Sequence, residues 1–189
     1  MEDDALGKWK SVIVAGKFQP FHLDHYDYVT AAFDVGDHVI IGITNPDPNY
    51  IKDEEADPKR STDEANPFTY YERYQMVLKS LVHGGYDRSR FDIVPFPINM
   101  PESWFFYIPK DIVFLITLYD DDKWLEIRKQ KLNDFGIQTE VLWSKKQKRI
   151  VGTNIRKLIR ENKNWENLVP FGTQQVLSQI DLKERLKGP

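Results

Sequence analysis

Two histidines stand three residues apart, directly after an apolar run that ends in glycine. His22 and His25 belong to segment 16–25, GKFQPFHLDH. Side chains three apart lie on one side of the first turn of a helix, and the N–H groups of that turn, with its partial positive charge, suit a phosphate. Two imidazoles there would stabilise the charge that develops on a reacting phosphorus. The alternative is that both are surface or capping residues of an aromatic turn.

Such a segment needs a strand before it and a helix after it. Residues 11–16 (SVIVAG) predict a short buried strand, and apolar residues at helical spacing predict a helix from about residue 23. Further strands are predicted at 38–44, 91–96, 111–118 and 139–143, and further helices at 69–82, 121–134, 153–161 and within 171–186.

Strands that alternate with helices predict an α/β fold. We expect a Rossmann-like, doubly wound, mostly parallel five-stranded sheet with helices on both faces. Ligands of such sheets bind beyond the carboxyl ends of the strands, which is where segment 16–25 lies. A long loop, 45–66, follows the second predicted strand. We interpret it either as a lid over the ligand or as an ordinary surface insertion.

Composition limits the class of protein. The 189 residues predict one domain, 1–189, and the net charge of −3 disfavours nucleic-acid binding. The chain has no cysteine, which excludes disulfides, thiolate zinc sites and catalytic cysteines. No apolar run approaches the roughly 20 residues that span a bilayer, and the N-terminus lacks the basic region of a signal peptide. We therefore expect a cytoplasmic protein with neither a membrane nor a nucleic acid as partner.

Three blocks of the sequence resemble those of the nucleotidyltransferase superfamily that carries an HxGH motif. Segment 16–25 resembles the GRFQPFHxGH signature, 66–73 (NPFTYYER) resembles an NPFTxxER block, and 151–156 (VGTNIR) resembles an SGTxIR block. The last two are typical of archaeal-type nicotinamide mononucleotide (NMN) adenylyltransferases. The blocks occur in the expected order and, with 165–170 (WENLVP), span most of the chain from residue 16 to residue 170.

The resemblance implies that a nucleoside monophosphate passes from a nucleoside triphosphate (NTP) to a small phosphorylated acceptor, with release of pyrophosphate. Mg²⁺ would accompany the triphosphate as the cofactor, and the chain itself would form no metal site. The main prediction is an NMN adenylyltransferase, which makes NAD from ATP and NMN. The alternatives are a CTP-using enzyme that acts on a phosphonate or another phosphorylated small molecule, and a non-catalytic nucleotide-binding module. Members of the family often form oligomers, so the resemblance also implies a homo-oligomer.

The resemblance assigns roles to individual residues. His22 and His25 would contact the triphosphate at the reacting phosphorus, Lys17 would add positive charge, and Arg156 would reach the β and γ oxygens. Thr153 would cap the helix that follows it. The predicted nucleotide-binding residues are Gly16, Phe18, Gln19, Asp24, Gly152 and Thr153. The predicted acceptor-binding residues are Asn99 and Trp104. Trp104 would stack on an aromatic acceptor or, alternatively, pack in the core.

Several positions depart from the family pattern. Asp24 occupies the glycine of HxGH, Val151 replaces a serine and Lys17 replaces an arginine. A negative charge at position 24 should weaken phosphate binding unless the carboxylate is turned away or paired. Otherwise it would cap the helix, contact the acceptor or help to hold Mg²⁺. The basic run 145–149 is interpreted as a phosphate-recruiting or a solvated loop, and the acids 120–122 as residues of a helix start.

Overall fold

The structure is a computed structural model that describes residues 9–48, 62–119, 125–145 and 149–186. Five parallel strands form one sheet in the order β3-β2-β1-β4-β5. They are β1 Trp9–Gly16, β2 Gly36–Thr44, β3 Phe91–Phe96, β4 Val113–Tyr119 and β5 Gln138–Lys145. The predicted Rossmann-like α/β fold is confirmed.

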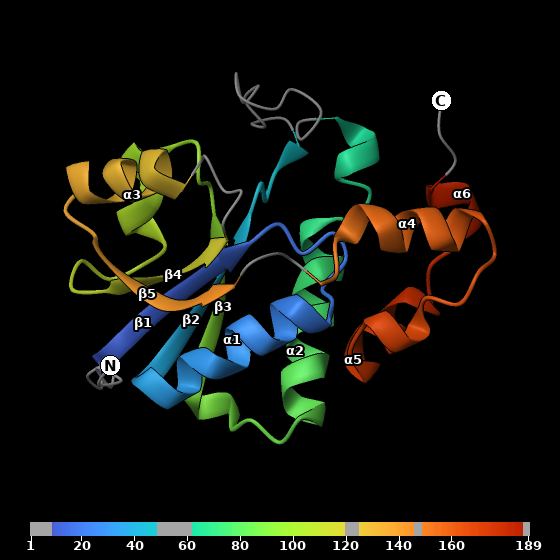
Figure 1. Ribbon diagram of the computed structural model, residues 1–189, viewed down its shortest axis with the longest axis horizontal. Helices are drawn as coiled ribbons and strands as arrows, with labels where there is room; N and C mark the ends of the chain where they lie inside the picture. The colour runs from blue at the N-terminus through green and yellow to red at the C-terminus, as the bar shows by residue number, and fades with distance from the viewer. Residues whose placement is uncertain (1–8, 49–61, 120–124, 146–148, 187–189) are drawn as a thin grey trace.

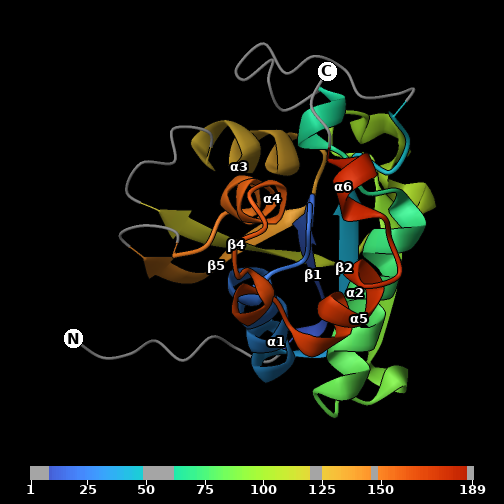
Figure 2. The same ribbon diagram turned by 90° about the vertical axis from the view of Figure 1, so that its right-hand side faces the viewer.

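Helices cover both faces of the sheet, as the alternating pattern predicts. They are α1 Leu23–Val35, α2 Tyr70–His83, α3 Leu125–Asp134, α4 Gly152–Arg160, α5 Phe171–Leu177 and α6 Leu182–Arg185. Short 3-10 helices lie at Asp63–Ala65, Arg88–Arg90, Pro101–Phe106 and Glu166–Leu168. Figure 1 shows α1 and α2 on the opposite side of the sheet from α3. Figure 2 shows α4, α5 and α6 together on the side that faces the viewer.

Each strand divides its side chains between two cores. Val12 and Val14 of β1 point into the core that α1, α2, α4 and α5 cover, whereas Ile13 points into the core beneath α3 and the 3-10 helix at Pro101–Phe106. Both faces of β1 are therefore apolar, which explains its continuous hydrophobic run. The parallel pairing of β1 with β2 and β4 then sets the end of the sheet at which segment 16–25 emerges.

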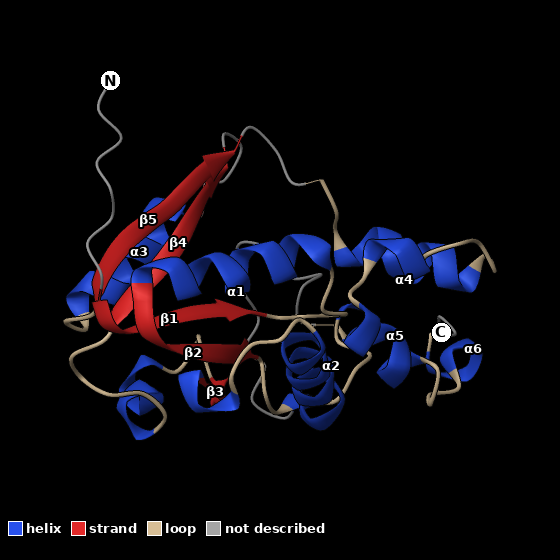
Figure 3. Ribbon diagram, turned by 90° about the horizontal axis from the view of Figure 1, so that it is seen from below, coloured by secondary structure: helices blue, strands red, loops and turns tan. Residues whose placement is uncertain are grey.

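The strand order reverses at β1, which has β2 on one side and β4 on the other. The register of β1 with β2 runs from Trp9 to Gly16, but β1 pairs with β4 only at Val12 and Ile13. The two strands therefore part toward their carboxyl ends, where sheets of this kind bind their ligands. In Figure 3, α1 and α4 begin next to each other just beyond this point.

Parts of two predicted elements lie outside the described residues. The predicted helix 121–134 corresponds to α3 from Leu125 onward, and residues 120–124 are not described. Of the loop 45–66, the structure describes 45–48 and 62–66, so that a lid stays a prediction. Glu64, near the end of this loop, makes a 2.7 Å ion pair with Arg160 of α4. Among the described residues, no helix is long and apolar enough to cross a membrane.

Candidate active site

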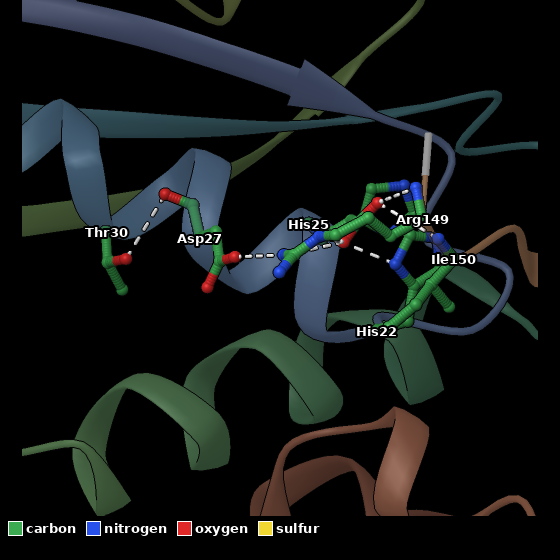
Figure 4. Close-up of polar contacts among 7 residues, drawn as sticks. His22, His25, Asp27, Thr30, Arg149 and Ile150 are labelled. Carbon is green, nitrogen blue, oxygen red and sulfur yellow. Dashed lines mark hydrogen bonds and ion pairs between the residues drawn. The ribbon is translucent and has the colours of Figure 1, made fainter. Parts of the chain in front are cut away.

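The two histidines lie together at the start of α1. His22 is the N-cap residue, and its Nδ1 accepts a hydrogen bond of 3.4 Å from the backbone N–H of His25. The rings stack with their centroids 3.6 Å apart, and both appear in Figure 4. A neutral imidazole that accepts at Nδ1 carries its proton on Nε2. Nε2 is therefore the ring nitrogen that we expect to donate to a phosphate.

The loop after β1 is packed tightly against the rest of the protein. Phe18 is fully buried, has a left-handed backbone (φ 52°) and makes an edge contact with His25. The Gln19 amide donates to the carbonyl oxygen of Phe68 and accepts from its N–H, both at 2.9 Å. The side chain of Gln19 thus holds the 66–73 block against segment 16–25. Its predicted contact with the nucleotide is therefore left to its backbone.

Arg73 supports the same loop, although the sequence pattern assigned it no role. It is only 2% exposed and donates to four carbonyl oxygens, those of Lys17 (2.9 Å), Thr44 (2.7 Å), Asn45 (2.8 Å) and Thr69 (3.2 Å). Burial lowers the pKa of Arg73 to about 10. This is still well above neutral pH, and Arg73 therefore stays charged. This one cation ties the carboxyl ends of β1 and β2 to the start of α2.

The N-terminus of α4 lies against the same loop. A Cβ added to Gly152 would be 2.5 Å from the backbone oxygen of Gln19. Nη1 of Arg156 donates to that same oxygen at 2.6 Å, and burial lowers the pKa of Arg156. The prediction that Thr153 caps this helix is wrong, because α4 begins at Gly152 with Val151 as N-cap. Thr153 Oγ1 instead accepts from Arg156 Nη2 at 3.3 Å.

Asp24 is paired, which is one of the alternatives that its sequence position left open. Its carboxylate, with 9% of the side chain exposed, accepts from the backbone N–H groups of Arg149 and Ile150 and forms an ion pair with the Arg149 guanidinium. Figure 4 shows Arg149 and Ile150 beside the histidine turn. Burial by itself raises the pKa of Asp24, but these hydrogen bonds and the guanidinium charge outweigh it and lower the pKa below its ordinary value. Asp24 is therefore ionised and compensated at neutral pH.

This pairing predicts a pH dependence of stability. A carboxylate whose pKa is lower in the folded than in the unfolded protein stabilises the fold above the unfolded pKa, about 3.9 for Asp. That contribution disappears as the pH falls through the lowered folded pKa. We expect Asp24→Asn to be less stable than the wild type at pH 7 and the two to converge as the pH falls through the lowered folded pKa of Asp24. Urea unfolding at several pH values measures the difference. A gap that stays constant down to pH 2 would contradict the ionised pairing.

The predicted acceptor-binding residues lie in or next to the core beneath α3 and the 3-10 helix at Pro101–Phe106. Trp104 is fully buried, with its ring 5.4 Å from that of Phe96 and 5.6 Å from that of Phe135, and its Nε1 donates to the Pro97 oxygen at 3.0 Å. This is the core placement that was the alternative to stacking on an acceptor. Asn99 is half-buried in the turn between β3 and the 3-10 helix that contains Trp104.

Two charged stretches are described only in part. Of the basic run 145–149, the side chain of Arg149 is described, and it pairs with Asp24 and Asp27 rather than being solvated alone. Residues 146–148 and the acids 120–122 lie outside the described residues. The recruiting role of the basic run therefore stays a prediction.

A cavity of about 430 Å³ borders the segment that leads into α4. Its wall combines apolar side chains with several positively charged ones. The volume of the cavity is in the size range of small-molecule sites. The lining residues are Arg149, Ile150, Val151, Asn154, Lys157, Leu158, Glu161, Lys163 and Leu168. None of the residues predicted for the site is among them, but the cavity adjoins Gly152 and the Asp24–Arg149 ion pair. It offers room beside the first turn of α4.

The donors of this site suit phosphate more than a metal ion. Mg²⁺ prefers oxygen ligands, and Asp24, the carboxylate between the two histidines in sequence, has its oxygens engaged by Arg149 and Ile150. The described residues contain no group of three or more His, Cys, Asp or Glu that could hold a metal. That Mg²⁺ enters with the triphosphate stays a prediction.

The close approach at Gly152 yields a prediction. Gly152→Ala would place a methyl group 2.5 Å from the Gln19 carbonyl oxygen, so the start of α4 must move away from the β1 loop. A misplacement of about 1 Å can reduce the rate of an enzyme about 10²-fold. We expect a loss of that order in turnover and also a lower melting temperature, because the added methyl forces packed backbone apart. Unchanged turnover would mean that this approach is not needed for the reaction.

Known proteins resemble this chain over nearly its whole length. A family model described as cytidylyltransferase-like matches residues 13–163. Phosphonoformate cytidylyltransferase from Streptomyces viridochromogenes is 38% identical over 176 residues, which are 93% of this chain and 95% of that protein. Nicotinamide-nucleotide adenylyltransferase from Methanococcus aeolicus is 30% identical over 185 residues, 93% of this chain and 92% of that protein.

A solved structure shows the same fold. It is a bifunctional NMN adenylyltransferase/ADP ribose pyrophosphatase from Francisella tularensis, complexed with AMP and a manganese ion. The TM-score is 0.61 at 15% identity, over 94% of this chain and 52% of that chain. This chain therefore spans about half of that longer protein, and the likeness concerns the fold alone.

Proposed function

Because the chain belongs to the cytidylyltransferase-like family, and is thus a nucleotidyltransferase, we propose that it transfers a cytidylyl group from CTP to a small phosphonate or related acceptor. Its similarity to the phosphonoformate cytidylyltransferase (38%) exceeds that to the nicotinamide-nucleotide adenylyltransferase (30%). The comparisons thus support the CTP alternative better than the main sequence prediction, NAD synthesis from ATP and NMN.

The burial of Trp104 carries the proposal for the acceptor. The resemblance to NMN adenylyltransferases implies that a tryptophan at this position stacks on the nicotinamide ring. Here the indole of Trp104 is fully buried, stacks on Phe96 and donates its N–H to the Pro97 oxygen. A ring in this position supports an acceptor that has no aromatic group to stack. A small phosphonate meets that description.

The reaction needs positioning and charge stabilisation rather than a nucleophilic side chain. An acceptor oxygen forms a bond to the α-phosphorus of CTP, and the bond from that phosphorus to the bridging oxygen breaks as pyrophosphate leaves. In our proposal His22 and His25 donate to the oxygens of the α-phosphoryl group, where charge develops. The N–H groups at the start of α4, together with Lys17 and Arg156, would hold the departing pyrophosphate. Mg²⁺ would enter on the triphosphate and neutralise part of its charge.

The pairing of Asp24 supports a catalytic function over the non-catalytic alternative. That alternative rested on the idea that the charge of Asp24 repels a triphosphate. The ion pair of Asp24 with Arg149, at 2.9 Å, compensates that charge inside the protein. The aspartate at position 24 is therefore compatible with binding of a triphosphate and with catalysis.

Pyrophosphate release tests the proposal. The protein with Mg²⁺ would be incubated with CTP or ATP, each together with phosphonoformate, other small phosphonates, or NMN. We expect turnover with CTP and a small phosphonate, and a cytidylylated product in a mass spectrum. A higher kcat/KM for ATP with NMN than for every CTP pair would overturn the assignment of both substrates. The same mixtures without acceptor control for simple hydrolysis of the triphosphate.

A further inference from the structure

Asp24 connects two parts of the site that are 125 residues apart in sequence. We call its contacts with Arg149 and with the backbone N–H of Ile150 the 24–149 clamp. In the first turn of α1, Asp24 lies between His22 and His25 in sequence. Arg149 and Ile150 directly precede Val151, the N-cap residue of α4. The clamp therefore joins the histidine turn to the segment that leads into the second phosphate-binding helix end.

The contacts of the carboxylate are complete. Oδ2 accepts from the N–H of Arg149 at 2.9 Å and from that of Ile150 at 3.0 Å. Oδ1 accepts from Nε of Arg149 at 3.0 Å and lies 2.9 Å from its Nη2. An ionised carboxylate has about four acceptor sites, and these contacts use them all. Asp24 is thus placed to hold the chain rather than to bind a phosphate-bound cation or the acceptor.

The clamp acts on α4 together with a second contact. Gly152 presses against the backbone of Gln19, and Asp24 holds the two residues that precede Val151. With both in place, the N-terminus of α4 has a fixed position relative to the histidine rings. A glycine at position 24, as in the motif that this segment resembles, has no side chain with which to make the clamp.

We propose that Asp24 is a positioning residue for the transfer reaction. Its carboxylate holds the N-terminus of α4 at the distance from His22 and His25 at which one triphosphate can contact both. Arg149 is its partner and neutralises it. This inference rests on the proposed function, since it assumes that the triphosphate contacts both α1 and α4 in the reaction.

Asp27 provides a matched control. It lies one turn further along α1 and pairs with Nη2 of the Arg149 guanidinium, whereas the backbone N–H groups of Arg149 and Ile150 both donate to Asp24. Its side chain is 45% exposed. Asp27→Asn therefore makes the same chemical change against the same arginine without releasing the segment that leads into α4.

The experiment compares Asp24→Asn, Asp24→Gly and Asp27→Asn with the wild type. We expect kcat for pyrophosphate release to fall about 10²-fold in both Asp24 variants, the order of loss that a misplaced group of about 1 Å causes. KM for CTP should change much less, because ground-state binding needs less exact alignment. Asp27→Asn should stay within about twofold of the wild type, as a partly exposed ion pair contributes little.

Hydrogen exchange supplies a readout that does not depend on turnover. The amides of Arg149 and Ile150 should exchange faster in Asp24→Asn than in the wild type or in Asp27→Asn. An Asp24→Asn protein that melts lower but keeps the wild-type kcat would assign the clamp to stability alone and overturn the inference. A wild-type protein that releases no pyrophosphate with any substrate pair would instead overturn the proposed function, and the exchange rates would still report whether the clamp exists.

Discussion

Replacing His22 by asparagine should lower kcat by about 10²–10³-fold, the usual loss when one preorganised donor to developing charge is removed. The stability of the variant should stay near that of the wild type. In the wild type, Nδ1 of His22 accepts a hydrogen bond from the backbone N–H of His25. Asparagine is among the best N-cap residues, so its side chain can accept the same bond. The substitution therefore separates the imidazole donor from the cap. Steady-state kinetics and thermal melting, measured on the same sample, give the two effects.

Alanine at the same position completes the comparison. His22→Ala should lose the same factor in kcat and, in addition, about 0.5–2 kcal/mol of stability, because the cap is lost. His25→Gln should also lower kcat, because the His25 ring stacks on that of His22 and lies at the same site. An asparagine variant that keeps kcat within a factor of about three would show that His22 caps α1 and takes no part in the chemistry.

Replacing Arg73 by methionine should lower the free energy of unfolding by about 3–5 kcal/mol. The substitution removes the donor from four carbonyl oxygens, of which that of Thr44 is buried and the other three are partly buried. Each buried unsatisfied group costs about 1–3 kcal/mol, and water and relaxation reduce the total. A typical domain is stable by only about 5–15 kcal/mol. The loss is therefore a large fraction of the whole, and urea unfolding followed by circular dichroism should show it directly.

Arg90 offers a control for the loss of an arginine that holds backbone. It donates to the carbonyl oxygens of Phe33, Gly36 and Asp37, which lie at the other end of the sheet from the candidate site. Arg90→Met should cost less stability because these bonds are more exposed, and it should leave kcat unchanged. Arg73→Lys keeps the charge but not the planar fork, so its stability should fall between the wild type and Arg73→Met. Equal stability of Arg73→Met and the wild type would contradict the supporting role.

The elements of the fold were accessible from local patterns. A strand shows itself through a β-branched apolar run and a helix through spacing of three and four, because the backbone period decides which neighbours share a face. The alternation of the two then predicted a parallel sheet with its ligand at the carboxyl ends. The placement of His22 and His25 was also predictable from local pattern. A spacing of three residues at the start of a helix puts both rings on one side.

The helix cap of α4 shows where local patterns mislead. Thr153 has a side chain that commonly caps a helix, and the sequence alone placed the helix start there. In the structure α4 begins one residue earlier, at Gly152, and the absence of a Cβ lets that residue approach the Gln19 oxygen. This contact joins the start of the helix to a loop more than a hundred residues away, which no local propensity encodes.

By itself, then, the sequence determined the sheet, the helices, the placement of the histidine pair and the nucleotidyltransferase class. Only the tertiary structure decided how Asp24, Arg73 and Trp104 are used. Asp24 is neutralised by Arg149, Arg73 holds the strand ends, and the Trp104 ring is packed in the core. The reason is physical. The type of a residue determines which bonds it can form, but most partners of these three residues lie far from them in the sequence. Which partner it meets depends on how the layers pack.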